Sequence, residues 1–378
     1  MREGTRRDTK LMARRSRFRG LLGGGVALLM MSWRAALAAE PSAAPVVLAK
    51  GISGAFLVGL DDHAVYWIEE GHGSGGAAGA PVHRLRRVAK QGGAAETLTE
   101  LHGDPEEMCG SAVVGGRAFF VVAGGSFEPW QIVAADTAKP GAPVSIGKPR
   151  SSLCHLVVQG DRLTWEDEEK DGGVWSAALD GSGAKQVWKT PEHSRVEGIA
   201  ARGRDLVFLV WTILPRSEKG SGLGGMGKLG QDSSHQAEVV LIPPGGKARS
   251  IWHGQGSPSD VDADGSDVAV CTRRGIVRVA GGQADGSSQA TSACQGGIRL
   301  WHGWYLVTEG DAQEGAPLVA RKVSAPEQSV QLVPHLYGGA KNLLLDSDAI
   351  YACAVGTKPE VCDLVRVPGP TSPAGGAK

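Results

Sequence analysis

Residues 156–165 read LVVQGDRLTW: an apolar segment, a Gly-Asp turn and a second apolar segment that ends on an aromatic residue. A turn of this kind between alternating apolar runs is typical of a β-hairpin. Six further segments have the same form: 57–67, 112–120, 199–208, 261–270, 298–306 and 343–351. Equivalent positions in successive segments are 36 to 61 residues apart, with a mean of about 47.5. This period predicts the blades of a β-propeller.

More short strands follow most of these hairpins. The sequence predicts third strands at 85–88, 131–133, 173–176, 239–242, 276–279 and 364–367, and fourth strands at 96–98, 143–146, 186–188, 249–252 and 330–333. The last unit, 342–367, lacks a fourth strand, and residues 45–51 (PVVLAKG) can supply it. That pairing would close the ring and remove two exposed sheet edges. We therefore predict an all-β fold, a single β-propeller of seven four-stranded blades closed by an N-terminal strand. Six or eight blades remain alternatives, because the fifth unit is the weakest match.

Composition agrees with a turn-rich, folded chain. Of 378 residues, 56 are Gly and 20 are Pro, and 42% are hydrophobic. This density of turn residues excludes a helix bundle, and the apolar content excludes general disorder. Residues 40–378 carry 31 Lys and Arg against 38 Asp and Glu. A mildly acidic chain argues against a nucleic-acid partner.

The first 39 residues have the composition of an export signal. A basic segment that contains Arg14 and Arg15 is followed by the short apolar run GLLGGGVALLMMS at 20–32 and by Ala36-Leu37-Ala38. This three-part pattern predicts a cleaved signal peptide, and the run is too short for a confident membrane span. An uncleaved anchor is the alternative. We expect a signal peptide at 1–39, a linker at 40–44, the propeller at 45–368 and a C-terminal tail at 369–378. The protein is then periplasmic or secreted, monomeric and without a stable membrane span.

Six cysteines in an exported chain permit disulfides. Cys353 and Cys362 flank a predicted hairpin, and a bond between the neighbouring strands is feasible. Cys109 and Cys154 occupy the same place in consecutive units and are expected to meet near the axis. Cys271 and Cys294 pair by elimination. Free, buried cysteines are the alternative for all six.

The repeats resemble those of a known group of proteins. Segments with a GGxxxxL stretch followed by an xxxDGxxVYW hairpin are similar to the repeats of exported bacterial propellers related to TolB-like and YWTD-type propellers. The best local matches are Gln91-Gly92-Gly93 through Leu98, and the run from Asp62 to Trp67. The resemblance covers about residues 45–368 and implies the fold, but no activity, because propellers host many functions.

Polar residues precede the first strand of six units at nearly equivalent places. If they converge at one mouth of the ring, they form a ligand-binding site. The alternative is that they cap strands and face water. These candidate ligand-binding residues are Glu107, His155, Glu197, Asp260, Gln295 and Asn342.

Three other segments have a plain and a functional interpretation. Residues 260–265 (DVDADG) resemble the start of a calcium loop, but the twelfth position is Cys271, and Asp264-Gly265 is better explained as a hairpin turn. The acidic run 165–171 is interpreted as a solvated hairpin tip. The Gly-rich insertion 215–236 lacks the Lys-Ser/Thr pair of a phosphate loop. The recurring tryptophans are interpreted as packing between blades.

The sequence contains no catalytic motif and no metal-binding motif, so we assign no catalytic residue, no metal ligand and no cofactor. We expect an exported propeller that acts as a binding or scaffold module for a protein or envelope ligand. The alternative is a propeller-type hydrolase or lyase with a polar or metal site at the axial mouth. The sequence does not decide whether the chain is an enzyme, and our first expectation is a propeller without enzymatic activity.

Overall fold

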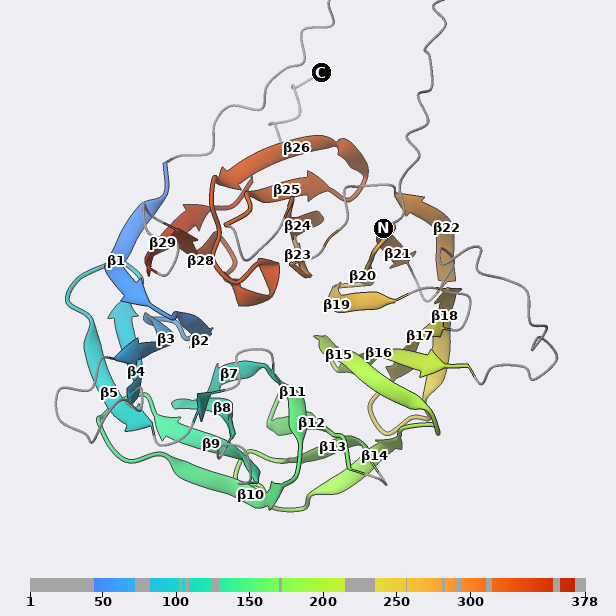
Figure 1. Cartoon of the computed structure of the whole chain (residues 1–378), viewed down its shortest axis with the longest axis horizontal. Coiled ribbons are helices and arrows are strands. Elements are labelled where there is room, and N and C mark those ends of the chain that lie inside the picture. Colours follow the sequence, from blue (N-terminus) through green and yellow to red (C-terminus); the bar gives the residue numbers. More distant parts are fainter. Residues whose placement is uncertain are drawn as a thin grey trace, which may run out of the picture. The chain divides into compact units, whose positions relative to one another are not determined.

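The computed structural model describes residues 44–71, 82–101, 104–105, 109–123, 129–169, 172–214, 235–255, 257–280, 283–289, 294, 296–310, 315–355 and 361–370. Seven antiparallel sheets of this part of the chain form a ring (Figure 1). The predicted seven-bladed propeller is therefore confirmed. The predicted signal peptide and most of the insertion lie outside the described residues.

Each blade has four main strands, which follow one another from the axis outward. The innermost strands are β2 (Phe56–Leu60), β7 (Ser111–Val114), β11 (Leu153–Gln159), β15 (Ser194–Arg202), β19 (Pro258–Asp264), β23 (Ile298–Trp301) and β27 (Leu344–Leu345). The second strands are β3 (Ala64–Gly71), β8 (Arg117–Ala123), β12 (Arg162–Asp167), β16 (Asp205–Ile213), β20 (Asp267–Thr272), β24 (Trp304–Thr308) and β28 (Ala349–Val355). All seven predicted hairpins are thus present.

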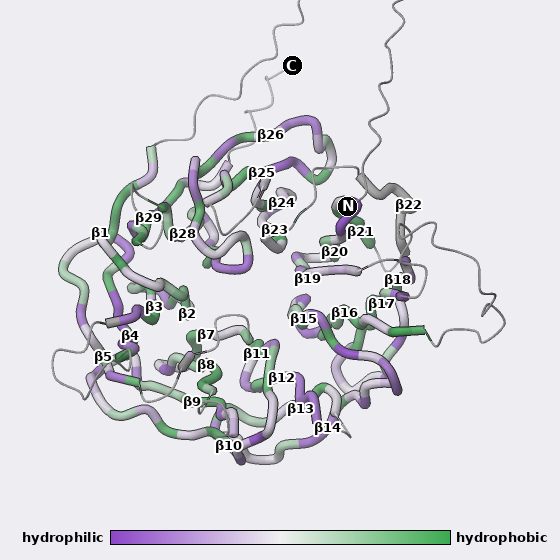
Figure 2. Tube along the Cα trace, in the orientation of Figure 1, coloured by the Kyte–Doolittle hydropathy of each residue, from purple (hydrophilic) through white to green (hydrophobic). Residues whose placement is uncertain are grey.

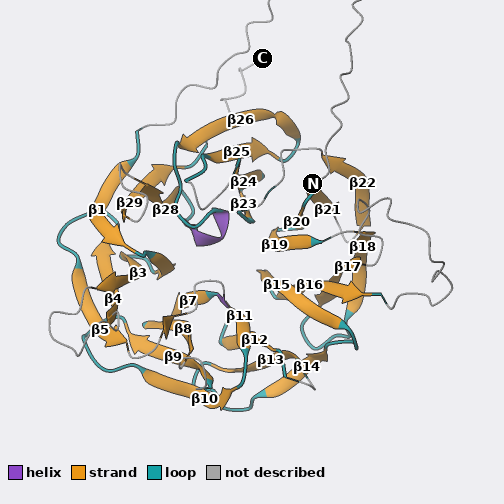
Figure 3. Cartoon of the chain, viewed as in Figure 1, coloured by secondary structure: helices purple, strands orange, loops and turns teal. Residues whose placement is uncertain are grey.

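The outer half of each blade completes the sheet. The third strands are β4 (Val82–Ala89), β9 (Trp130–Asp136), β13 (Gly173–Ala178), β17 (His235–Ile242), β21 (Gly275–Ala280), β25 (Leu318–Lys322) and β29 (Val361–Pro368). The fourth strands are β5 (Glu96–Leu101), β10 (Val144–Arg150), β14 (Lys185–Lys189), β18 (Arg249–Gln255), β22 (Gln283–Gln289), β26 (Ala325–Val333) and β1 (Val46–Ser53). A short β6 (Asp104–Pro105) also pairs with β8, and the 3-10 helix η5 (Ala340–Asn342) lies near the axis (Figure 3).

The N-terminal strand closes the ring as the sequence predicts. β1 pairs antiparallel with β29, so that Val47 lies opposite Val365 and Ile52 opposite Cys362. The two ends of the described chain therefore share one sheet. Closure leaves no blade without its fourth strand, which removes the edges that an open ring would expose.

The apolar core is divided among the seven contacts between neighbouring blades. Each pair of adjacent blades shares one cluster of buried side chains. Figure 2 accordingly shows apolar residues in strands around the whole ring rather than at one centre. Trp67, Trp165 and Trp304 belong to three of these clusters, which supports their interpretation as packing between blades.

Strand alternation explains how one sheet serves two interfaces. Successive side chains of a strand point to opposite faces. In β8, Phe120 and Val122 pack against the first blade, whereas Phe119 and Val121 pack against the third. A strand buried on both faces needs this continuous apolar run.

Three disulfides reinforce the ring, and the predicted pairs are confirmed. Cys109–Cys154 joins the second blade to the third, and Cys271–Cys294 joins β20 to the segment that precedes β23. Cys353–Cys362 joins neighbouring strands within the last blade. The described residues contain no free cysteine.

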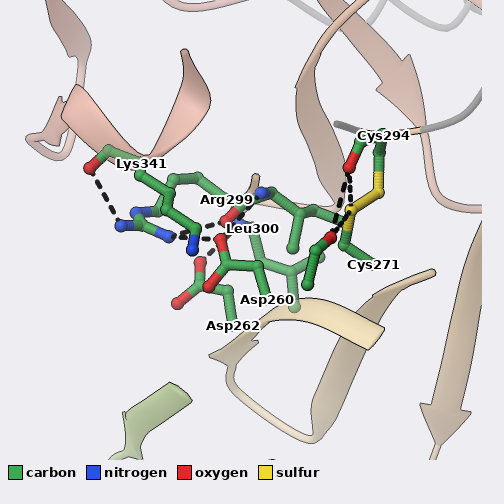
Figure 4. Close-up of polar contacts among 9 residues, drawn as sticks. Asp260, Asp262, Cys271, Cys294, Arg299, Leu300 and Lys341 are labelled. Atoms are coloured by element: carbon green, nitrogen blue, oxygen red, sulfur yellow. Dashed lines mark hydrogen bonds and ion pairs between the residues drawn. A yellow bond between two sulfur atoms is a disulfide. The ribbon is translucent and has the colours of Figure 1, made fainter. Parts of the chain in front are cut away.

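Each innermost strand is the edge of its sheet, so its backbone N–H groups at the axis need hydrogen-bond acceptors from outside the sheet. Between the fifth and sixth blades, three aspartates supply these acceptors. The Oδ2 atoms of Asp260, Asp262 and Asp264 accept hydrogen bonds from the backbone N–H groups of Ile298 (3.0 Å), Leu300 (2.6 Å) and His302 (2.9 Å). Figure 4 shows the first two aspartates beside the sixth blade.

This aspartate ladder explains the DVDADG motif. Asp264 lies opposite Asp267 at the end of the β19–β20 hairpin, so Asp264-Gly265 is the turn, as interpreted from the sequence. Alternate carboxylates are required because alternate residues of β23 present their N–H groups to β19. Within the described residues, no group of three His, Cys, Asp or Glu side chains is placed to hold a metal ion. That part of the chain also contains no helix with the length and apolar content to cross a membrane.

The disulfides should differ in their effect on stability. Loop-closure entropy predicts that a bond across 45 residues stabilises by about 4 kcal/mol, and one across 9 residues by about 2.5 kcal/mol. Replacing both Cys109 and Cys154 by Ala should therefore lower the free energy of unfolding more than replacing both Cys353 and Cys362. Urea titrations of the two double variants measure the difference, and equal losses would contradict the loop-entropy explanation.

The aspartate ladder predicts a graded response to substitution. Asp260 is 6% exposed and accepts from the buried Ile298 N–H, so Asp260→Ala leaves a buried donor unpaired. We expect a loss of about 2–3 kcal/mol in the free energy of unfolding. Asp264→Ala is the matched control, because its partner His302 lies in contact with water, and it should cost less than about 1 kcal/mol. A reversed order would show that the ladder is not the source of the stability.

Candidate functional site

The centre of the ring holds a cavity of about 350 Å³. Residues from all seven innermost strands or the segments that precede them line it. The first, second and fourth blades contribute mainly apolar or small residues, such as Phe56, Ala112 and Ile199. The charged lining residues lie on the fifth to seventh blades, and His155 comes from the third. A further hollow of about 400 Å³ shares Asp262, Arg299, Leu343 and Leu344 with this cavity and reaches the other end of the inner strands.

Only some of the predicted ligand-binding residues line the cavity. His155 and Asp260 line the cavity. Asn342 does not, because its side chain ties the last blade to the first: Oδ1 accepts from Leu57 N–H (2.8 Å) and Nδ2 donates to the Ala55 carbonyl (3.2 Å). Glu197 lies on β15 and pairs with Arg195. Glu107 and Gln295 lie outside the described residues.

Arg299 connects three blades at the cavity wall. Its Nη1 donates to Asp260 Oδ2 (3.2 Å), and its Nη2 donates to the carbonyl of Lys341 (3.0 Å). These contacts link the fifth, sixth and seventh blades, and Figure 4 shows Arg299 between Asp260 and Lys341. Burial raises the pKa of the neighbouring Asp262 to about 6, against the opposing effect of the Arg299 charge.

A histidine–glutamate pair stands out on the third blade. Glu166 on β12 is 2% exposed, and its Oε1 accepts from Val196 N–H of the next blade (3.0 Å). Its Oε2 has no hydrogen-bond partner among the described residues and lies 3.6 Å from His155 Nε2. His155 lines the cavity, whereas Glu166 contacts His155 without lining the cavity itself.

The two side chains have pKa values far from their ordinary range. Burial raises the pKa of Glu166 to about 8. Burial, together with the Lys341 ammonium, lowers the pKa of His155 to about 4. Near neutral pH the carboxyl group therefore retains its proton and the imidazole is neutral. Pairs of titratable groups with such displaced values are common at sites of acid–base chemistry, although structural networks produce them too.

Local backbone geometry places His155 at the cavity. His155 has a positive φ of 54°, and the β11–β12 register shifts between Cys154 and Val157. A non-glycine residue in this region is uncommon and persists only where its surroundings hold it. Cys154, directly opposite Glu166 in the sheet, is bonded to Cys109 and anchors this bulge.

Glu166 corrects our interpretation of the acidic run. The run 165–171 was expected to be a solvated hairpin tip, but Glu166 and Asp167 are each only 2% exposed. Both residues belong to β12, which ends at Asp167 and therefore includes the start of the acidic run. Glu168 and Glu169 follow the strand and are exposed. In the sequence, only the predicted Cys109–Cys154 disulfide could have indicated that Glu166 is buried, because Cys154 lies opposite Glu166 in the sheet.

Comparisons with known proteins extend these observations. No protein-family model matches the chain, and no curated protein matches it in sequence. Among solved structures, a puromycin-hydrolyzing peptidase of Mycobacterium tuberculosis is similar over 88% of this chain and 55% of its own, with 15% identity and a TM-score of 0.55. The propeller domain of the Trilobed protease from Pyrococcus furiosus matches over 83% and 94%, with 10% identity and a TM-score of 0.57. An acylaminoacyl peptidase of Pyrococcus horikoshii matches over 79% and 49%, with 10% identity and a TM-score of 0.54.

These similarities support the propeller fold but not the specific TolB-like or YWTD-type relationship. The chain spans about half the length of the puromycin-hydrolyzing and acylaminoacyl peptidases. They also correct our functional expectation. The binding or scaffold module expected from the sequence is contradicted, because several of these neighbours are peptidases.

The displaced pKa of Glu166 predicts a pH-dependent stability. Folding raises this pKa from 4.5 to about 8, so its contribution to stability is complete below pH 4.5 and is lost as the pH rises through 8. The loss amounts to up to about 1.4 kcal/mol per pH unit. Glu166→Gln keeps the acceptor for Val196 N–H but does not titrate. The stability of this variant relative to wild type should therefore increase from pH 5 to pH 8.

Urea titrations at four pH values measure this difference. The control is Glu327→Gln on the exposed part of β26, which measures the effect of the same substitution on the outermost strand of a blade. A pH-independent difference for Glu166→Gln would show that Glu166 ionises normally.

Proposed function

We propose that this chain takes part in the hydrolysis of peptides or peptide-like amides, and that its axial cavity holds the substrate. The peptidase neighbours support this reaction class, and the cavity supports the location. Because the chain spans about half the length of several of these peptidases, the activity of a whole protein is part of the proposal.

The observation that carries the proposal is the His155–Glu166 pair at the cavity wall. His155 is neutral near pH 7 and can accept a proton from water that attacks a carbonyl carbon. Glu166 holds a proton and stands 3.6 Å behind the imidazole. Above its raised pKa, where the Glu166 proton has passed to solvent, the carboxylate stabilises the imidazolium that forms when His155 takes the proton from the attacking water, as the third group does in a nucleophile–base–orienter arrangement. The imidazolium then gives that proton to the amine, which leaves as the C–N bond breaks.

The attacking group in this proposal is water rather than a serine. Ser111 is a cavity-lining serine, but its Oγ donates to the carbonyl of Val58 (2.8 Å). That hydrogen bond satisfies the edge of the first blade. Among the described residues, no hydrogen bond joins Ser111 Oγ to the His155 ring, so this pair is not a serine–histidine dyad in the structure.

An extracytoplasmic location belongs to the same proposal. Three disulfides persist in oxidising compartments, which fits the predicted export signal at 1–39. We propose that the mature chain acts in the periplasm or after secretion, as a monomer. Substrates would then be peptides or amides that reach that compartment.

Hydrolysis by the purified full chain tests the proposal. Aminoacyl and peptidyl p-nitroanilides, puromycin and short peptides with a free C-terminal carboxylate are offered, and release of p-nitroaniline, of the amine or of a new amino terminus is followed. His155→Gln should reduce kcat/KM by about 100-fold or more, the usual contribution of a general base. His253→Gln, at an exposed residue of β18, is the matched control and should retain wild-type activity. No turnover by the wild type, or full activity of His155→Gln, would overturn the proposal.

A further inference from the structure

Lys341 is a cation in the axial cavity whose ammonium makes no ion pair or hydrogen bond with the described residues. It lies in η5, is half-buried and lines the cavity together with His155 and Asp260. In the described part of the chain, no carboxylate oxygen lies within 4.0 Å of its Nζ, and the Nζ makes no hydrogen bond.

The neighbouring cation, Arg299, shows what a structural role looks like in this cavity. Its guanidinium donates to Asp260, to the carbonyl of Ile298 and to the carbonyl of Lys341. Arg299 is therefore occupied in joining blades. It also fixes the backbone of Lys341, while the Lys341 ammonium is left for other contacts.

The stem of Lys341 is held in place by a glycine. Gly297 has a φ of +90°, and a Cβ atom on it would lie 2.4 Å from Lys341 Cγ and 2.8 Å from Asp260 Oδ2. The lysine methylenes therefore pass directly over the backbone of Gly297. A stem packed in this way loses less freedom when its ammonium binds a ligand, which favours affinity.

The cavity around Lys341 is polar on one side and apolar on the other. Lys341, Arg299 and the two aspartates come from the fifth to seventh blades, and Figure 4 shows them together. Phe56 and Ile199 belong to the apolar wall. This arrangement suits a ligand with an anionic end and apolar side groups, and the volume of about 350 Å³ suits a short peptide.

We propose that Lys341 binds the carboxylate of a ligand in the axial cavity, so that the substrates are short peptides with a free C-terminal carboxylate. The claim that these ligands are substrates rests on the proposed peptide hydrolysis. The binding of their carboxylate by Lys341 does not depend on turnover. A charge-assisted hydrogen bond from a half-buried ammonium is stronger than one at an open surface.

Two probes that differ only in one charge test the proposal: N-acetyl-trialanine and N-acetyl-trialanine amide. Calorimetric titration of the purified full chain should show that the acid binds at least 10-fold more tightly than the amide. Lys341→Met keeps the stem that covers Gly297 and removes the charge, so it should abolish the preference for the acid. Lys247→Met, at an exposed turn outside the cavity, should retain the preference.

The outcomes separate the two proposals. Equal affinity of the wild type for acid and amide, or no binding of either, overturns the carboxylate site without the need for any variant. A preference that survives in Lys341→Met also overturns it. Acid-selective binding without hydrolysis of any substrate leaves the carboxylate site standing and removes the proposed hydrolysis. Hydrolysis without a preference for the acid leaves the proposed hydrolysis standing and removes the carboxylate site.

Discussion

The ring depends on how the edges of seven sheets are satisfied at the axis. Each innermost strand pairs with one neighbour only, so half of its backbone groups face the next blade without a ladder partner. Side chains of the adjacent blades take that place. Asp260, Asp262 and Asp264 do so for the sixth blade, Glu166 for the fourth, and Asn342 and Ser111 for the first. Apolar clusters bind the outer parts of the blades, and these polar contacts set their alignment at the centre.

The same constraint produces the unusual chemistry of the axis. Carboxylates that accept backbone N–H groups there are removed from water, which raises the pKa of Glu166 and Asp262. A polar residue at the axis is therefore explained by the ring before any function is invoked. The informative groups are those with bonding capacity left after the edges are satisfied. Among the described residues, the Oε2 atom of Glu166 and the ammonium of Lys341 meet that condition, and both lie at or directly behind the cavity that His155 lines.

Much of the fold could be predicted because each blade repeats one local pattern. A hairpin needs only a turn between apolar runs, so all seven inner hairpins were visible in the sequence. The disulfides were visible because Cys109 and Cys154 hold equivalent places in consecutive units. Two outer elements were missed. β22 has the polar sequence QADGSSQ, and β25 reads LVARK, three apolar residues followed by two charged ones, so neither carries the alternation that marks a strand.

The candidate site was less predictable, because it is assembled from different repeats. His155 and Asp260 were named from their equivalent positions before the first strands and line the cavity, whereas the side chain of Asn342, named by the same argument, joins the last blade to the first. Glu166 was hidden in an acidic run, because sequence does not show where a strand ends and a solvated tip begins. No pattern in the sequence pointed to Lys341. We selected it because its ammonium has no ion-pair partner among the described residues, while Arg299 and Gly297 of the sixth blade hold its backbone and its stem. A repeat pattern constrains what each blade shares, whereas the binding of a ligand depends on where the blades differ. In this ring the differences concentrate the charges on three consecutive blades and leave an apolar wall opposite them.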